Sequence, residues 1–163
     1  MISVDIDNVR FNLRVGGVCV DDGYVLVNRN PGDDWYYLPG GRCEPMEATD
    51  QTLLREIQEE LELPIRLDGL LWVVENFFRM NGRDWHEIGF YYRCSLPADC
   101  PYLDKTRSYE RIESADGLPL IFEWLPLADL ATVKLLPIVL RAKLMALPAS
   151  PEHIVHWDAP AIL

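Results

Sequence analysis

The sequence predicts an α/β fold of the α+β type, in which a β-sheet is covered by helices within a single domain spanning residues 1–163. The chain has 163 residues, which suits one domain and is long enough to bury a core. Segments rich in β-branched and aromatic residues are mixed with two or three helical patterns. The hydrophobic fraction of 49% and the charged fraction of 25% argue against a mostly disordered, collagen-like or coiled-coil chain.

Two apolar strands open the expected sheet. Residues 11–21 and 24–30 are rich in β-branched and aromatic side chains, and the tripeptide Asp-Asp-Gly at 21–23 joins them. This pattern predicts a β-hairpin. Residues 31–46 hold several Pro and Gly residues and are expected to form a loop with one short apolar piece at 36–38.

An amphipathic helix is predicted from Glu47 to about Leu61. No Gly or Pro interrupts this stretch, and Leu53, Ile57 and Leu61 recur at helical spacing. Pro64 is expected to stop the helix.

The remaining elements are expected to complete the sheet. Residues 66–79 and 86–96 alternate or run apolar on either side of an Asn-Gly pair at 81–82, which predicts a second hairpin. The polar stretch 97–118 is expected to be a long loop. Residues 119–125 have the pattern of a strand.

The C-terminal third is expected to contain a second helical region. Residues 126–147 have a helical pattern that is broken at Pro137, and residues 153–157 have the pattern of a short edge strand.

The charge balance narrows the range of partners. Fifteen Lys and Arg against twenty-six Asp and Glu give a net charge of −11, so the chain is not expected to bind polymeric nucleic acid or an anionic membrane. The N-terminus lacks the apolar run of a secretory signal. The four cysteines form no C-x-x-C pair, which favours free thiols and a cytoplasmic location. A small polyanion remains an expected ligand if metal ions stand between it and the carboxylates.

Residues 44–62 carry the strongest chemical signal. They contain seven acids against one base, Arg55. Glu56, Glu59 and Glu60 share a helix face, where each like-charge pair costs about 0.2–0.5 kcal/mol. Divalent cations such as Mg²⁺ or Mn²⁺ remove this repulsion, because they bind carboxylate and carbonyl oxygens. The alternative is an acidic face turned to solvent.

Residues 41–63 resemble the signature of the Nudix hydrolase family. That signature is a Gly, five residues, a Glu, seven residues and then Arg-Glu-U-x-Glu-Glu-x-Gly-U, where U is a bulky aliphatic residue. Here Gly41 and Glu47 stand at the first two positions, and residues 55–63 read REIQEELEL. Every defined position matches except the second Gly, which is Glu62. Because Glu is a poor residue for a left-handed cap, we expect the helix to end differently here, helped by the proline that follows.

The resemblance implies an αβα sandwich with a mixed β-sheet and an activity that depends on Mg²⁺ or Mn²⁺. The implied reaction is hydrolysis of a pyrophosphate bond in a nucleoside diphosphate linked to X, such as a nucleotide sugar, a nucleoside triphosphate or a dinucleoside polyphosphate. Many members of the family are dimers, so a homodimer is an expectation as well. Residues 77–80 read FFRM and carry neither the Pro nor the Tyr that marks two substrate subgroups, so the nucleotide stays open.

Two alternatives come from other functional classes. One is a catalytically silent Nudix-fold module that binds nucleotides or regulates a partner, and the complete set of signature carboxylates argues against it. The other is a calcium-binding protein, but the sequence contains no EF-hand loop.

The resemblance also assigns roles around the metal. It implies that Glu59 and Glu60 are the main metal ligands and that Glu56 is a ligand or a general base. The carbonyl of Gly40 is a further ligand. Arg55 is expected to orient a neighbouring carboxylate through a charge-assisted hydrogen bond.

Substrate contacts and the general base are expected outside the acidic helix. Arg29 and Arg42 flank the glycine loop and are candidate phosphate contacts, with a surface position as the alternative. Phe78 is a candidate for stacking on a base, although packing within the hairpin is the alternative.

In some family members the base is a Glu on a later loop. Glu110 and Glu113 are the candidates for that role here, and Glu87 is a weaker third. Glu47 is expected to brace the junction between loop and helix.

Overall fold

The computed structural model describes residues 1–112 and 117–158. These residues form ten strands, two α-helices and one 3-10 helix. In chain order the elements are β1 (Ser3–Ile6), β2 (Val9–Asp21), β3 (Tyr24–Arg29), β4 (Trp35–Tyr37), α1 (Thr49–Leu61), β5 (Arg66–Met80), β6 (Arg83–Ser95), β7 (Tyr109–Ile112), β8 (Pro119–Pro126), the 3-10 helix (Leu127–Asp129), β9 (Lys134–Leu136), α2 (Val139–Lys143) and β10 (Glu152–Trp157).

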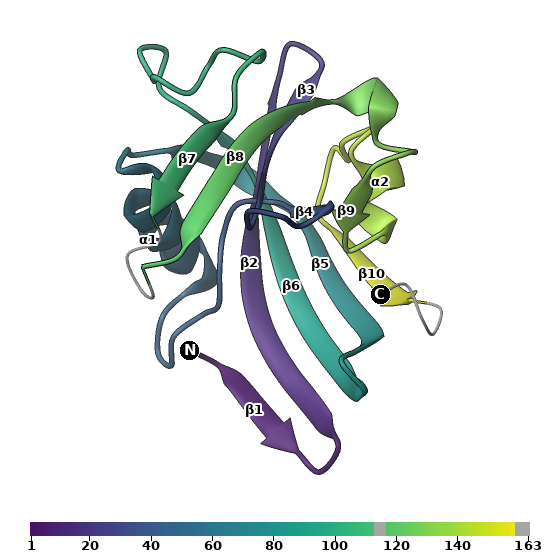
Figure 1. Cartoon of the computed structure of the whole chain (residues 1–163). Helices are drawn as coiled ribbons and strands as arrows, with labels where there is room; N and C mark the ends of the chain where they lie inside the picture. Colours follow the sequence, from purple (N-terminus) through teal and green to yellow (C-terminus); the bar gives the residue numbers. More distant parts are fainter. Residues whose placement is uncertain (113–116, 159–163) are drawn as a thin grey trace.

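The strands form one mixed sheet. Its main order is β10-β5-β6-β2-β3-β4-β9, with β1 paired to β2, β8 paired to β3, and β7 paired to β8. The long strand β2 runs parallel to β6, and β5 pairs antiparallel with β6 along nearly its whole length. The two helices lie on opposite sides of the sheet (Figure 1). The predicted αβα sandwich with a mixed sheet is therefore confirmed.

Both predicted hairpins are present, and their turns have the geometry that the sequence signals require. Asn81 and Gly82 have φ values of 53° and 75°, and Asp22 and Gly23 have values of 47° and 79°. Two successive positive φ angles are typical of the type I′ turn, whose twist matches that of antiparallel strands. The first hairpin pairs only briefly, through Val20 with Val25 and Asp21 with Tyr24, whereas the earlier part of β2 pairs with β6.

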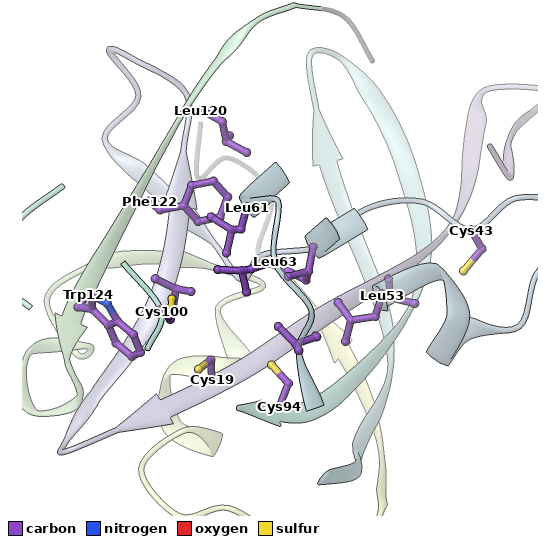
Figure 2. Packing of buried hydrophobic residues seen from close by; sticks show 14 residues of the cluster. Cys19, Cys43, Leu53, Leu61, Leu63, Cys94, Cys100, Leu120, Phe122 and Trp124 are labelled. Atoms are coloured by element: carbon purple, nitrogen blue, oxygen red, sulfur yellow. The ribbon is translucent and has the colours of Figure 1, made fainter. Parts of the chain in front are cut away.

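The predicted amphipathic helix is α1, and its apolar side covers one face of the sheet. Leu53, Ile57 and Leu61 are buried in a cluster with Phe122 and Trp124 of β8. Figure 2 shows several of these side chains gathered between the helix and the strands. Burial of a Leu or Ile side chain contributes about 1.5–3 kcal/mol, so this cluster anchors the acidic helix to the sheet.

All four cysteines belong to the same cluster. Figure 2 labels Cys19, Cys43, Cys94 and Cys100 among its buried residues. All four cysteines are buried free thiols. They contribute apolar volume to the core and form no cross-link.

A second cluster fills the opposite face of the sheet. Trp72 and Val74 of β5 pack there with Leu135 of β9 and Leu140 of α2. Two cores, one on each face, give the molecule its three layers. Neither α-helix in the described part of the chain has the length and apolar character needed to cross a bilayer.

Two predictions for the C-terminal half were wrong in part. Residues 97–118 contain the strand β7, which pairs with β8 through Tyr109 and Phe122. Residues 126–147 are mostly not α-helical, because the strand β9 pairs with β4 within them and α2 covers only Val139–Lys143. Both strands are too short to show a period of their own, and pairing decides their conformation: β7 pairs with the next strand along the chain, and β9 with the distant strand β4. The predicted edge strand at 153–157 is confirmed as β10.

We expected α1 to end without the left-handed cap that a glycine would supply, and this expectation was also wrong. Glu62 adopts the left-handed conformation, with φ 56° and ψ 33°, and its backbone N–H donates to the carbonyl of Gln58. Arg111 on β7 forms an ion pair with the Glu62 carboxylate and donates from Nε to the Glu60 carbonyl at 3.2 Å. A left-handed non-glycine residue costs about 1–2 kcal/mol, and the two contacts from Arg111 offset part of that cost.

A double-mutant cycle tests this compensation. In the wild-type background, Glu62→Gly relieves the left-handed strain but removes the ion pair, so the free energy of unfolding should change by less than about 0.5 kcal/mol. In an Arg111→Ala background the ion pair is already absent, and Glu62→Gly should stabilise the protein by about 1 kcal/mol. Urea unfolding of the four proteins measures both steps, and equal effects in the two backgrounds would contradict the compensation.

Candidate active site

The glycine loop is held against β2 by backbone hydrogen bonds. Gly17 N–H donates to the carbonyl of Pro39 at 2.7 Å, and Val15 N–H donates to that of Gly41 at 2.8 Å. Gly40, between them, has a φ of 142°, and a Cβ there would collide with the Val15 carbonyl oxygen. Because alternate carbonyls of an extended segment point to opposite sides, the Gly40 carbonyl is expected to point away from β2.

The loop also approaches the acidic helix closely at Gly41. A Cβ at this position would overlap the carboxylate of Glu56. A side chain is therefore excluded at the two positions for different steric reasons. At Gly40 it would collide with β2, and at Gly41 it would collide with an acidic side chain of α1. Together they bring backbone oxygens and a carboxylate into one small space.

Arg55 and Glu47 form the central ion pair of the site. Arg55 donates from Nε to Oε1 of Glu47 at 2.8 Å and from Nη2 to Oε2 at 2.9 Å, which is the bidentate arrangement of a guanidinium and a carboxylate. Glu47 also accepts from the Thr52 hydroxyl at 2.8 Å and from the Glu44 N–H at 3.2 Å. Glu47, which was predicted to brace the loop against the helix, therefore accepts four hydrogen bonds where the two segments meet.

The other edge of the Arg55 guanidinium faces the remaining carboxylates. Its Nη1 donates to Glu56 at 2.8 Å and to Glu59 at 3.2 Å, and its Nη2 donates to the carbonyl of Arg42 at 3.4 Å. One cation therefore contacts three acids and the loop backbone. This arrangement accounts for a helix that carries so many like charges.

The environment separates the acids by pKa. The hydrogen bonds from Arg55 hold the pKa of Glu47 at about 2, well below its ordinary value of 4.5. Burial raises the pKa of Glu56, although Arg55 acts in the opposite direction and the charge of Glu59 adds to the rise. Glu47 is thus a permanently charged anchor, whereas Glu56 is a carboxylate to which burial makes negative charge costly.

The signature residues line one cleft of about 700 Å³. Its walls include most of the residues expected at the site: Gly40, Arg42, Arg55, Glu56, Glu59 and Glu60. Within the described ranges, no three acidic, His or Cys side chains are grouped closely enough to hold an ion in their present positions. In this arrangement the carboxylates of Glu56 and Glu59 form ion pairs with Arg55.

The donor set nevertheless fits a hard divalent cation. Three carboxylates and a loop carbonyl supply only oxygen atoms, as Mg²⁺ and Mn²⁺ prefer. Glu59 is the most exposed of the three, with 42% of its side chain accessible, and its 3.2 Å contact with Arg55 is longer than the 2.8 Å contact of Glu56.

A second pocket of about 280 Å³ adjoins the cleft. Arg14, Tyr37 and Arg42 line both spaces. Phe78 and Trp85 also line the pocket, with their rings stacked at 5.5 Å between centroids and 14° between planes. The predicted stacking residue therefore lies beside the acidic cleft and not within it.

The other predicted residues are not brought to the cleft. Arg29 is paired with Glu123 at 2.8 Å and is absent from the cleft lining. Glu110 is an exposed residue of β7, outside the lining of both spaces. Glu87 lines the second pocket, and Glu113 lies outside the described residues.

Sequence reasoning missed several residues of the two spaces, above all Arg14. Desolvation acts to lower its pKa, but the negative charge of Glu87 and weaker contributions from nearby tyrosines and Glu60 raise it, so the half-buried guanidinium stays charged. Asn12 and Asn76 were missed too. The available signal was a polar residue on an otherwise apolar strand: Asn12 and Arg14 are two residues apart and so share one face of β2.

Substitution of Glu47 should measure how much this carboxylate contributes to stability. Glu47→Gln replaces a charged bidentate acceptor and should lower the free energy of unfolding at pH 7 by about 1–3 kcal/mol. Because the folded pKa of Glu47 is about 2 against an ordinary 4.5, its stabilisation is present above pH 4.5 and is lost as the pH falls toward 2. Urea unfolding of both proteins between pH 7 and pH 2.5 should show the difference shrinking below pH 4.5.

Asp84→Asn is a matched control, because Asp84 is an exposed carboxylate that pairs with Arg79 at 3.5 Å. Its effect should stay below about 0.5 kcal/mol across the same pH range. A difference between wild type and Glu47→Gln that does not vary with pH would contradict the assigned anchor role.

Solved structures with this fold share little sequence with the chain. A UDP-X diphosphatase has a TM-score of 0.58 and 18% identity, and the match covers 88% of this chain and 66% of that one. A Nudix hydrolase from Nitrosomonas europaea has a TM-score of 0.56 and 17% identity, with coverage of 90% and 79%. At this level of identity the likeness concerns the fold alone.

Sequence comparisons extend the likeness to the family. An 8-oxo-dGTP diphosphatase from Proteus vulgaris is 31% identical over 78 residues, which cover 45% of this chain and 69% of that protein. The family model of the NUDIX domain matches residues 10–145, which include the glycine loop, the acidic helix and the strands of the second pocket. The chain therefore belongs to the Nudix hydrolase family.

Proposed function

We propose that the protein is a Mg²⁺-dependent pyrophosphohydrolase that cleaves a nucleoside diphosphate linked to X. The observation that carries the proposal is that Gly40, Glu56, Glu59 and Glu60 line one cleft, although they come from a loop and a helix. Membership of a family of hydrolases supports the same reaction class.

The proposed metal ligands are Glu56, Glu59 and Glu60 with the Gly40 carbonyl, and Mn²⁺ is an alternative ion. A bound ion of this kind neutralises phosphate charge and lowers the pKa of a coordinated water. Arg55 keeps Glu56 near the loop through their hydrogen bond at 2.8 Å and so acts as a positioning residue.

Two arginines are proposed to contact the phosphates. Arg14 and Arg42 line both the acidic cleft and the adjoining pocket, so a substrate that spans the two spaces passes between them. A guanidinium binds phosphate oxygens with a planar fork. These cations and the metal explain how a chain with a net charge of −11 binds a polyanion.

The proposed base remains one of several carboxylates. Glu56 is the candidate within the cleft, and Glu110 and Glu113 are the candidates on the later segment. Because Glu110 is exposed and does not line the cleft, a role for it requires movement of β7 toward the loop.

Two substrate classes follow from the comparisons. The relative from Proteus vulgaris suggests a nucleoside triphosphate such as 8-oxo-dGTP. The similar solved structure of a UDP-X diphosphatase suggests a nucleoside diphosphate linked to a second group. Both contain the pyrophosphate bond that the cleft is proposed to hydrolyse.

A hydrolysis screen tests the reaction. The purified chain is incubated with nucleoside triphosphates, 8-oxo-dGTP, ADP-ribose, nucleotide sugars and dinucleoside polyphosphates, each with Mg²⁺, with Mn²⁺ and with EDTA. We expect metal-dependent turnover of at least one substrate with kcat/KM above about 10⁴ M⁻¹s⁻¹, and mass analysis of the products identifies the bond. Metal binding without turnover of any compound would instead favour the catalytically silent module.

Removal of one proposed ligand gives a sharper test. Glu59→Gln should lower kcat by at least about 100-fold with the fold intact, because the residue is half-exposed and contributes little to the core. Asp50→Asn on the same helix removes a half-buried carboxylate that does not line the cleft and should leave kcat within about twofold. Near-normal turnover of Glu59→Gln, with Mg²⁺ affinity unchanged, would remove Glu59 from the site.

A further inference from the structure

Three buried polar residues form a row across the centre of the sheet. Asn76 of β5 is the register partner of Glu87 on β6, and Glu87 is the register partner of Asn12 on β2. The three strands lie side by side in Figure 1. Asn76, Glu87 and Asn12 are only 4%, 6% and 2% exposed. We call this set the polar row.

The hydrogen bonds of the polar row are incomplete. Asn12 donates from Nδ2 to Oε2 of Glu87 at 2.8 Å, and this bond fixes which end of its amide faces the carboxylate. Oδ1 of Asn12 and Oδ1 of Asn76 are buried and have no hydrogen-bond partner. An unpaired buried acceptor costs about 1–3 kcal/mol, so a row that served only to stabilise the sheet would be expected to satisfy these atoms.

The polar row lines the second pocket, whose other walls are suited to a flat ring. The stacked rings of Phe78 and Trp85 line it together with Leu136 at the end of β9 and Pro137, which follows this strand. An apolar slot with a few convergent polar groups is the usual form of a small-molecule site. Since Arg14 and Arg42 line both the pocket and the acidic cleft, a ligand in the pocket would lie next to the place where the phosphates are proposed to bind.

We propose that the polar row selects the nucleobase of the substrate and that the selected base is of the guanine type. The unmet groups of the row are acceptors: two amide oxygens and a carboxylate that takes only one hydrogen bond from Asn12. A matching ligand must present neighbouring N–H donors on one edge. Guanine does so with its ring N1–H and its exocyclic amino group, and a carboxylate accepts both at once.

The other bases fit this row less well. Adenine and cytosine each place a ring acceptor beside their amino group, and that acceptor would face the lone pairs of Glu87. Uracil and thymine flank their one N–H with carbonyl oxygens, so two further acceptors would meet the row. A buried acceptor left unpaired by the wrong ligand is the physical basis of discrimination by hydrogen bonding.

This inference rests on the proposed function for the phosphates but concerns binding as well as turnover. Isothermal titration of the wild-type chain with GMP, AMP, CMP and UMP in EDTA measures base preference without hydrolysis. We expect GMP to bind at least about 10-fold more tightly than the other three, as one bidentate pair contributes. Equal affinities for the four nucleotides would overturn the proposal.

Substitutions then assign the preference to the row. Glu87→Gln keeps an oxygen that accepts from Asn12 but brings an amide N–H toward the base, and the preference for GMP should fall to less than about threefold. Asn76→Leu, which removes one acceptor, should weaken GMP binding with little effect on UMP. The matched control is Glu75→Gln, because Glu75 neighbours the row in sequence but pairs with His153 and is absent from the pocket lining.

Failure of this proposal differs from failure of the proposed function. A GMP preference that Glu87→Gln abolishes, together with no hydrolysis in the screen, would support the row and reject the hydrolase. Hydrolysis with the same kcat/KM for guanine, adenine and uracil nucleotides, unchanged by Glu87→Gln, would reject the row and keep the hydrolase. If Glu87→Gln fails to fold, the wild-type titration and Asn76→Leu still decide the question.

Discussion

The site depends on one guanidinium among many carboxylates. Arg55 binds Glu47 in a bidentate pair, and its remaining donors contact Glu56, Glu59 and the loop backbone at Arg42. Without this cation, the adjacent acids of the helix would repel one another, and the Thr52 hydroxyl would be left as the side-chain donor of α1 to Glu47. The same contacts hold the carboxylates near the loop. Arg55 therefore links stability to the geometry on which metal binding is proposed to depend.

The two spaces meet along a narrow boundary of positive and aromatic side chains. Arg14, Tyr37 and Arg42 line both, and the Arg14 guanidinium lies over the Tyr37 ring at 5.6 Å. Arg14 is half-buried, and the negative charges of Glu87 and Glu60 favour its charged form. These acids therefore stabilise the cation where the two spaces meet.

How far the sequence could predict this molecule depended on whether the signal was local. The two Asp/Asn-Gly turns and the periodic helix carry their own signals, and both hairpins and α1 were predicted correctly. The strands β7 and β9 were missed because both are too short to show a period of their own, and β9 is defined by pairing with the distant strand β4. The metal-binding candidates form one contiguous signature, whereas Asn12, Arg14 and Asn76 come together only through strand register. Glu62 was misjudged because its compensation comes from Arg111, far along the chain.

The separate origin of the two spaces has a consequence for how such a protein diversifies. The acidic cleft is built by a loop and a helix, while the floor of the second pocket is built by the middle of β5, β6 and β2. Side chains at alternate positions of a strand change without disturbing the backbone ladder. Substitutions at the polar row can therefore alter ligand choice while the reactive segment stays constant. In this architecture, substitution of side chains on the strands can change which ligand binds, while the loop and helix of the acidic cleft keep their sequence.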